Sequence, residues 1–242
     1  MSQRQPTLSE LFLDFFWPNR CPFCGEIIAP QQHCCPDCLA SFPPPPDVFV
    51  PLLDAAFSFT TYTPEAARAI HLLKFYNQPK LGAVLAKLIF RTFEQELADC
   101  RIDCICATPM HPKKQRERGY NQAERMATEL ARLCQLPCLP LLEKTVQTSA
   151  QHTLSAEQRK HNLRGSCRVA LPDEVKEKRI LVVDDVITTG ATMNEAAHAL
   201  RQAGAAWVGG ISFAHPSFED EYAFSKDIAS ISTKKIAHTS KA

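Results

Sequence analysis

The apolar run ILVV at residues 180–183 constrains the fold of this chain more than any other stretch. The run lacks the alternation of apolar and polar residues that marks a strand with one solvated face, so it predicts a strand buried on both faces. Two acids and a small, hydroxyl-rich turn follow it, and residues 191–205, ATMNEAAHALRQAGA, then predict a helix closed by Gly204. A buried strand joined to a helix by a short turn is the unit from which parallel α/β sheets are built.

The same unit recurs along the chain. The expected strands are AAFSFTTY at 55–62, IDCICATPM at 102–110, RILVVDD at 179–185 and AAWVGGISFA at 205–214. The expected helices are residues 65–76, which follow Pro64, then about 81–98 and 121–134. Strands that alternate with helices over short connections predict an α/β fold, with a mainly parallel sheet flanked by helices.

The overall charge is close to neutral and excludes a global attraction to nucleic acid. The chain has 242 residues, of which 27 are basic and 26 acidic, and its net charge is +1. Any surface for an anionic partner must therefore come from local clustering of charge.

Cysteines cluster near the N-terminus, in CPFCGEIIAPQQHCCPDC at residues 21–38. Two Cys-x-x-Cys pairs can each present two thiolates from a tight turn, and two such turns facing each other complete a tetrahedral site. The best four ligands are Cys21, Cys24, Cys35 and Cys38, which predict structural Zn²⁺ because four thiolates leave no open position. Cys34 and His33 remain alternative ligands at this stage.

No secretory signal pattern is seen, so a cytoplasmic location is expected. In such a reducing compartment clustered cysteines indicate a metal site rather than disulfides. The apolar run at residues 11–17, LFLDFFW, is far shorter than the ~20 residues that cross a bilayer, so no membrane span is expected.

Four consecutive prolines at residues 43–46 indicate a stiff spacer and suggest a domain boundary. The expected division is an N-terminal zinc module with its proline-rich linker at 1–46, an α/β domain at 47–224 and a polar tail at 225–242.

The turn after the buried strand has the chemistry of a phosphate site. Backbone N–H groups and hydroxyls at the start of a helix favour an anion, and the candidates are Thr188, Thr189, Gly190, Ala191 and Thr192. The turn lacks the lysine of a Walker A loop and the glycines of a dinucleotide fingerprint. Asp184 and Asp185, directly before it, are placed to accept hydrogen bonds from the hydroxyls of a sugar phosphate.

A basic segment follows the strand that ends near Pro109, with Lys113, Lys114, Arg116 and Arg118 within six residues. Such a run is usually a solvated face, but its place at a second strand end brings it to the same crevice. It can act as a loop that clamps pyrophosphate, or it can contact single-stranded DNA with Tyr120 as a stacking face.

The segment DDVITTGAT at 184–192 resembles the phosphoribosyl pyrophosphate (PRPP) motif of type I phosphoribosyltransferases. The resemblance implies that Asp184 and Asp185 hold the ribose 2′ and 3′ hydroxyls as the catalytic candidates, and that residues 188–192 bind the 5-phosphate. It also implies that Mg²⁺ is carried on the oxygens of PRPP.

Further motifs are similar to those of the ComF family, in the same order along the chain. They are the CPFC and CPDC pairs, LLKFYNQ at 72–78, PMHPKKQRERGYNQA at 109–123 and the spaced set Thr148, Gln151, Arg159 and Asn162. The resemblance implies a role in natural transformation and DNA uptake. Two hypotheses follow: Mg²⁺-dependent transfer of phosphoribosyl from PRPP to an unidentified acceptor, or a non-catalytic PRPP sensor or single-stranded-DNA-binding module that works with cytoplasmic DNA-uptake proteins.

Overall fold

The computed structural model describes residues 19–29, 32–75, 79–145 and 166–216. The segment at residues 11–17, the spaced set from Thr148 to Asn162 and the tail at 225–242 lie outside the described residues.

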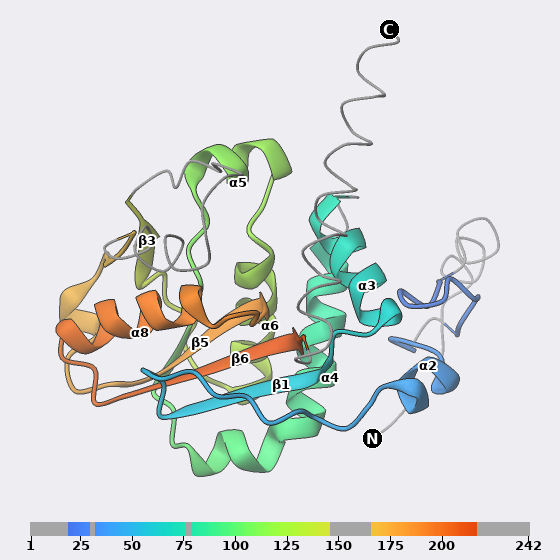
Figure 1. Ribbon diagram of the computed structural model, residues 1–242, viewed down its shortest axis with the longest axis horizontal. Coiled ribbons are helices and arrows are strands. Elements are labelled where there is room, and N and C mark those ends of the chain that lie inside the picture. Colours follow the sequence, from blue (N-terminus) through green and yellow to red (C-terminus); the bar gives the residue numbers. More distant parts are fainter. Residues whose placement is uncertain (1–18, 30–31, 76–78, 146–165, 217–242) are drawn as a thin grey trace, which may run out of the picture.

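A four-stranded parallel sheet forms the centre of the molecule (Figure 1). Its strands are β1 (Ala55–Thr61), β2 (Cys104–Ala107), β5 (Arg179–Val186) and β6 (Trp207–His215), in the order β1-β6-β5-β2. Neighbouring strands are all parallel, with Leu181 opposite Gly209 between β5 and β6 and Ile105 opposite Leu181 between β2 and β5. The predicted fold class is confirmed.

Helices cover both faces of this sheet (Figure 1). The helices α3 (Pro64–Phe75), α4 (Pro79–Asp99) and α6 (Gln122–Cys134) pack on one face, and α8 (Ala191–Gln202) packs on the other. The smaller elements are α2 (Pro36–Ser41), α5 (Pro112–Arg118), the 3₁₀ turn η1 (Pro172–Glu174) and an antiparallel pair of β3 (Leu142–Lys144) and β4 (Cys167–Val169).

The unbroken apolar run of β5 serves two cores. Leu181 and Val183 pack into the core under α3, α4 and α6, whereas Ile180 and Val182 pack into the core under α8. Successive side chains of a strand point to opposite faces, so a strand covered on both sides needs apolar residues at every position. This explains why the run shows no alternation.

The N-terminal cysteine module shares the first of these cores. The Phe23 ring stacks on Phe213 of β6 with centroids 6.1 Å apart, and it meets the Phe42 ring edge to face at 4.8 Å. Cys21, Cys35 and Cys38 are buried in the same cluster. The module is therefore packed against the end of β6 rather than held at a distance from the sheet.

The proline-rich segment and the residues after it, 42–54, run from α2 back along the sheet and α8 (Figure 1). Leu52 N–H donates to Asn194 Oδ1 of α8 at 3.1 Å. A Cβ at Gly210 of β6 would stand 2.5 Å from Leu53 Cδ1, so a larger residue there would force the Leu53 side chain to move. The segment is thus packed along the sheet, and the proposed division between residues 46 and 47 stays a prediction.

Candidate active site and metal centre

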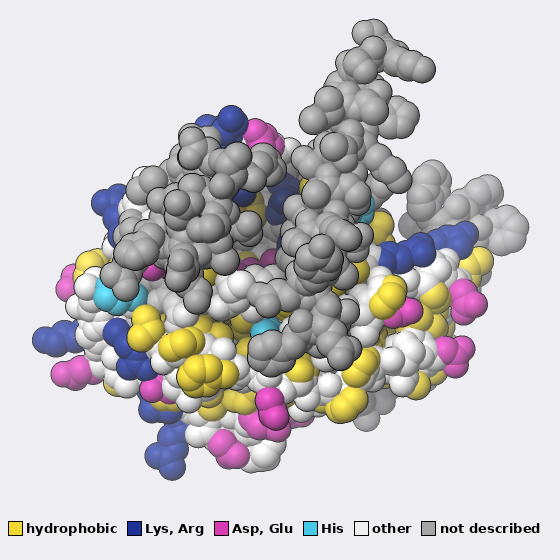
Figure 2. All heavy atoms as spheres, in the orientation of Figure 1, with side chains coloured by type: hydrophobic (Ala, Val, Ile, Leu, Met, Phe, Trp, Pro, Cys, Tyr) yellow, Lys and Arg dark blue, Asp and Glu magenta, His cyan; other side chains and the backbone are white. Residues whose placement is uncertain are grey.

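The carboxyl ends of β2 and β5 open into one cavity of about 520 Å³. Ligands of open α/β sheets bind at this edge, in the crevice outside the strand ends. Basic side chains dominate its charged lining, namely Lys74, Lys113, Lys114, Arg118 and Lys144, against the acids Glu117, Asp184 and Asp185. Figure 2 shows Lys and Arg side chains at the top of the molecule around α5. A ligand that combines phosphate groups with hydroxyls suits this mixture of charges.

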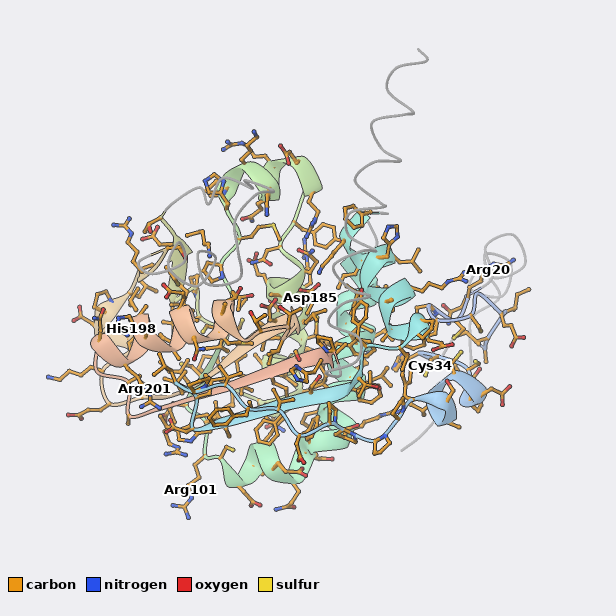
Figure 3. All side chains as sticks on the ribbon, viewed as in Figure 1. Arg20, Cys34, Arg101, Asp185, His198 and Arg201 are labelled. Carbon is orange, nitrogen blue, oxygen red and sulfur yellow. The ribbon has the colours of Figure 1, made fainter. Side chains whose placement is uncertain are left out.

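Asp184 and Asp185 directly precede Val186, the last residue of β5, and both line the cavity. The Asp185 backbone N–H donates to Asp184 Oδ1 at 2.8 Å, which orients the Asp184 carboxyl group. Figure 3 shows Asp185 near the middle of the molecule, where the ends of several elements converge. The structure thus brings the predicted sugar-binding acids to the predicted edge of the sheet.

The two acids differ in their surroundings. Burial raises the pKa of Asp184 to about 8, and the charge of Asp185 and a hydrogen bond between the two side chains act in the same direction. Asp184 is therefore mainly protonated near neutral pH, although the residue keeps part of its surface exposed. Asp185 is 8 % exposed, and its Oδ2 lies 2.6 Å from Lys74 Nζ in an ion pair. The contact lacks the geometry of a hydrogen bond, and Oδ2 has no hydrogen-bond partner among the described residues.

The candidate phosphate turn lies between β5 and α8. Gly190 is the N-cap of α8 with a φ of 70°, a left-handed conformation that glycine adopts without strain. A Cβ there would also stand 3.0 Å from Val50 Cγ2. At the other end of the turn, Ile187 O lies 2.6 Å from His215 Nδ1 of β6. The turn is therefore held from both sides.

Of the five turn residues, only Thr192 lines the cavity, while Thr188, Thr189, Gly190 and Ala191 do not. Thr189 is exposed and Gly190 is buried against Val50. Binding of a 5-phosphate by residues 188–192 stays a prediction.

The basic segment is a short helix, α5, and the expectation of a loop is wrong. His111 caps its start by accepting a hydrogen bond from Lys113 N–H at 3.1 Å, and Gly119 ends it in a left-handed conformation with a φ of 87°. Lys113, Lys114 and Arg118 line the cavity, but Arg116 is exposed and lies outside it.

Arg118 is the most enclosed of the four basic residues. Its guanidinium lies over the Phe75 ring, 5.6 Å from the centroid. Burial lowers the pKa of Arg118, and the nearby charge of Asp185 opposes this shift. Arg118 and Lys74 thus both place positive charge near Asp185.

Tyr120 cannot serve as a stacking face, contrary to the DNA-binding alternative above. The residue is only 5 % exposed, and its hydroxyl donates a hydrogen bond to the Leu73 backbone carbonyl in the last turn of α3. The ring therefore ties α3 to the segment that leads into α6.

The cavity also contains residues to which the sequence assigned no role. Lys74 and Lys144 line it, as do Asn121 and Gln122 at the start of α6. Asn121 caps α6 and donates to Thr108 O at 2.9 Å, which joins the ends of α6 and β2. Gln122 is 2 % exposed, and its Oε1 has no hydrogen-bond partner among the described residues. The motifs around Lys74 and Gln122 could have drawn attention to them, but nothing marks Lys144.

The second candidate site is the cysteine cluster beside α2. The Sγ atoms of Cys21, Cys24, Cys35 and Cys38 all lie within 4.8 Å of one another. Three backbone N–H groups donate to these sulfurs: Cys35 N–H to Cys21 Sγ at 3.4 Å, Cys38 N–H to Cys35 Sγ at 3.3 Å and Glu26 N–H to Cys24 Sγ at 3.5 Å. Burial alone would raise the pKa of Cys21, but backbone hydrogen bonds outweigh it and lower the pKa to about 7.

The geometry of this cluster fits a tetrahedral Zn²⁺ ion. With Zn–S bonds of about 2.3 Å, the sulfurs of such a site are about 3.8 Å apart. Cys24 Sγ and Cys35 Sγ are 3.7 Å apart. Neither Cys34 nor His33 belongs to the group of four, and Figure 3 places Cys34 beside α2. Ligation of zinc by these four cysteines stays a prediction.

None of the described helices is both long and apolar enough to cross a membrane.

Comparison with known proteins identifies a phosphoribosyl transferase domain at residues 117–236. The chain is 34 % identical to the DNA utilization protein YhgH of Escherichia coli (strain K12), over 78 % of this chain and 80 % of that protein. It is 32 % identical to competence protein F of Haemophilus influenzae (strain Rd), over 76 % of this chain and 80 % of that protein.

Among solved structures, the glutamine PRPP amidotransferase of B. subtilis aligns over 59 % of this chain and 30 % of its own, at 21 % identity and a TM-score of 0.41. The chain therefore belongs to the ComF family of competence proteins and carries a phosphoribosyltransferase domain.

Proposed function

We propose that the cavity at the ends of β2 and β5 binds PRPP. Asp184 and Asp185 accept hydrogen bonds from the ribose hydroxyls, and residues 188–192 hold the 5-phosphate. Lys113, Lys114 and Arg118 face the pyrophosphate. The observation that carries this proposal is the cavity itself, in which two adjacent acids at a strand end meet a lining rich in cations.

The reaction that suits this site is transfer of the phosphoribosyl group. The bond between ribose C1 and pyrophosphate breaks, a nucleophile bonds to C1, and negative charge grows on the leaving pyrophosphate. Basic side chains fixed in a cavity stabilise such charge more strongly than water does. Mg²⁺, when bound, would ride on PRPP oxygens near Asp184 and Asp185 and neutralise part of the same charge.

Pyrophosphate release from PRPP and Mg²⁺ tests the transfer, measured with and without single-stranded DNA. The Asp184→Ala, Asp185→Ala double variant is expected to abolish both release and PRPP binding. A matched control is Asp173→Ala, Glu174→Ala, which removes two adjacent acids from the exposed turn η1. Tight PRPP binding by the wild type without release under any acceptor tried would favour the sensor over the enzyme.

A role in DNA uptake is proposed from the family. Relatives carry the names competence protein F and DNA utilization protein, which describe processes rather than a reaction. The thiol-rich metal centre fits a reducing compartment such as the cytoplasm. Partners would then be single-stranded DNA or cytoplasmic uptake proteins.

Contact with single-stranded DNA is the second candidate function, and Arg116 favours it. This side chain points to solvent on α5 and lies outside the cavity that the other three basic residues line. Each contact with a DNA phosphate steepens the slope of the logarithm of the binding constant against the logarithm of salt concentration by about one unit. Arg116→Gln should therefore make DNA binding less dependent on salt and leave PRPP affinity unchanged. The double variant Lys113→Gln, Lys114→Gln should instead lower the affinity for PRPP. Equal effects of both variants on PRPP would leave Arg116 without a separate role.

A further inference from the structure

The ion pair between Lys74 and Asp185 occupies a position that the proposed substrate needs. Lys74 lies in the last turn of α3, and its Nζ is 2.6 Å from Asp185 Oδ2. Among the described residues, neither Asp184 nor Asp185 forms any other ion pair. A lysine that lies in a cavity and holds one of the two candidate sugar ligands must affect what those ligands can bind.

Asp185 Oδ2 is closed to solvent in this arrangement. A sugar hydroxyl that donates to a carboxylate oxygen stands about 2.5 to 3.0 Å from it. Lys74 Nζ already stands at that distance. A ribose hydroxyl therefore reaches Oδ2 only after the ammonium group has moved.

The lysine backbone is fixed, but its side chain can move. The Tyr120 hydroxyl donates to Leu73 O, the carbonyl directly before Lys74, and anchors the last turn of α3. The side chain of Lys74 keeps 26 % of its surface exposed, and its four-carbon stem lets a compact charge swing without a change of backbone. Lys113, Lys114 and Lys144 line the same cavity as Lys74, so an anion bound by these lysines would lie in the cavity that Lys74 also lines.

We propose that Lys74 changes partner when PRPP binds: it leaves Asp185 Oδ2 to the ribose hydroxyls and moves to the pyrophosphate. This inference rests on the proposed function. In the free protein the lysine neutralises the buried acid, and in the complex it adds a cation to the leaving group. Lys74 is thus a substrate-binding residue whose resting contact competes with the sugar.

The two roles of Lys74 have opposite signs and can be separated with two ligands. Ribose 5-phosphate carries the hydroxyls and the 5-phosphate but no pyrophosphate. Loss of the lysine removes a competitor for this ligand and takes no contact away from it. PRPP, in contrast, loses a charge-assisted contact, which corresponds to about a tenfold loss of affinity.

The test is calorimetric binding of PRPP with Mg²⁺ and of ribose 5-phosphate to the full-length wild type and Lys74→Met. The variant should bind PRPP about tenfold more weakly and ribose 5-phosphate at least as tightly as the wild type. The matched control is Lys87→Met on α4, because Lys87 is similarly exposed at 29 % and faces Glu129 Oε1 at 3.9 Å, outside the cavity. It should change neither affinity.

Any other pattern overturns the inference. Equal weakening of both ligands would mean that Lys74 only orients Asp185 for the sugar, and no change in either would make the pair a bystander. Thermal unfolding checks that the variant is folded, and Lys74→Gln, which keeps a donor for Asp185, takes its place if it is not. A wild type that binds neither ligand would refute the proposed function itself, and the inference with it.

Discussion

The cysteine cluster and the carboxylate cavity are built from the chain in opposite ways. All four sulfurs of the cluster come from the 18 residues between Cys21 and Cys38. The cavity combines side chains from α3, α5, α6, β3, β5 and α8, over a span from Lys74 to Thr192. A site whose ligands are close in sequence can be predicted from their spacing alone. For a site assembled from distant segments, the sequence reveals only the segment in which several site residues lie together.

The two regions also respond differently to the rest of the fold. The cluster ties down its own short loops, yet it shares a core with Phe213 of β6. The cavity depends on where α3, α5 and α6 end. Loss of the metal should therefore destabilise the sheet as well as the cluster, while substitutions at the cavity should disturb only the cavity.

The largest effect is expected for Cys35→Ser. The variant should lose about one zinc per chain and lower the free energy of unfolding on the order of 5 kcal/mol, because metal binding and folding are coupled and the cluster packs on the sheet. Metal analysis and thermal unfolding measure both. Cys34→Ser is the matched control, since Cys34 is the neighbouring residue and lies outside the group of four. Loss of zinc from the Cys34→Ser control as well would contradict the assignment of Cys35, rather than Cys34, as the ligand.

A smaller effect is expected for Gly190→Ala in the candidate phosphate turn. A left-handed conformation costs an alanine about 1 to 2 kcal/mol, and its Cβ would press on Val50 Cγ2 at 3.0 Å. Denaturant unfolding should show this loss, and PRPP affinity should fall while bound zinc stays unchanged. A simultaneous loss of zinc would contradict the local character of the cavity.

The smallest effect concerns the pH dependence of stability through Asp184. Its folded pKa of about 8 lies above its ordinary value of 3.8, so the folded chain holds an extra proton between these pH values. Stability therefore falls as pH rises from about 4 to 8, and the loss is complete above pH 8. Asp184→Asn should match the wild type near pH 4 and exceed it at pH 9, by about 1 kcal/mol given the partial exposure of the residue. If the free energy of unfolding depends on pH in the same way in both proteins, the extra proton of the folded state is not on Asp184.

Much of the α/β domain could be predicted from short stretches. The run at 180–183 identified a strand covered on both faces, and the acids after it indicated the edge of the sheet where the cavity lies. The helix α5 is predicted as a loop because its seven residues are too few to show an apolar period, and its caps, His111 and Gly119, are the signals in the sequence that mark its two ends. A period needs at least two turns before one face can be distinguished from another.

The remaining features depend on contacts that sequence does not display. Lys144 reaches the cavity because β3 pairs with β4, and the segment around Lys144 has no composition that marks it. The sequence suggests that Tyr120 is available for stacking, but its hydroxyl donates to Leu73 O and its ring is buried. The stacking of Phe23 on Phe213 joins residues almost the whole chain apart, which no local pattern reveals.

The contact of Val50 with Gly190 gives the proline run a second consequence. Val50 is 2 % exposed and fills the space that a side chain at Gly190 would need, so a residue of the segment 42–54 packs directly beneath the candidate phosphate turn. The four prolines between α2 and Val50 form a stiff spacer, which restricts where Val50 can lie relative to the turn. A protein engineered to begin at β1 would keep every strand of the sheet but would leave that turn without the side chain packed beneath it.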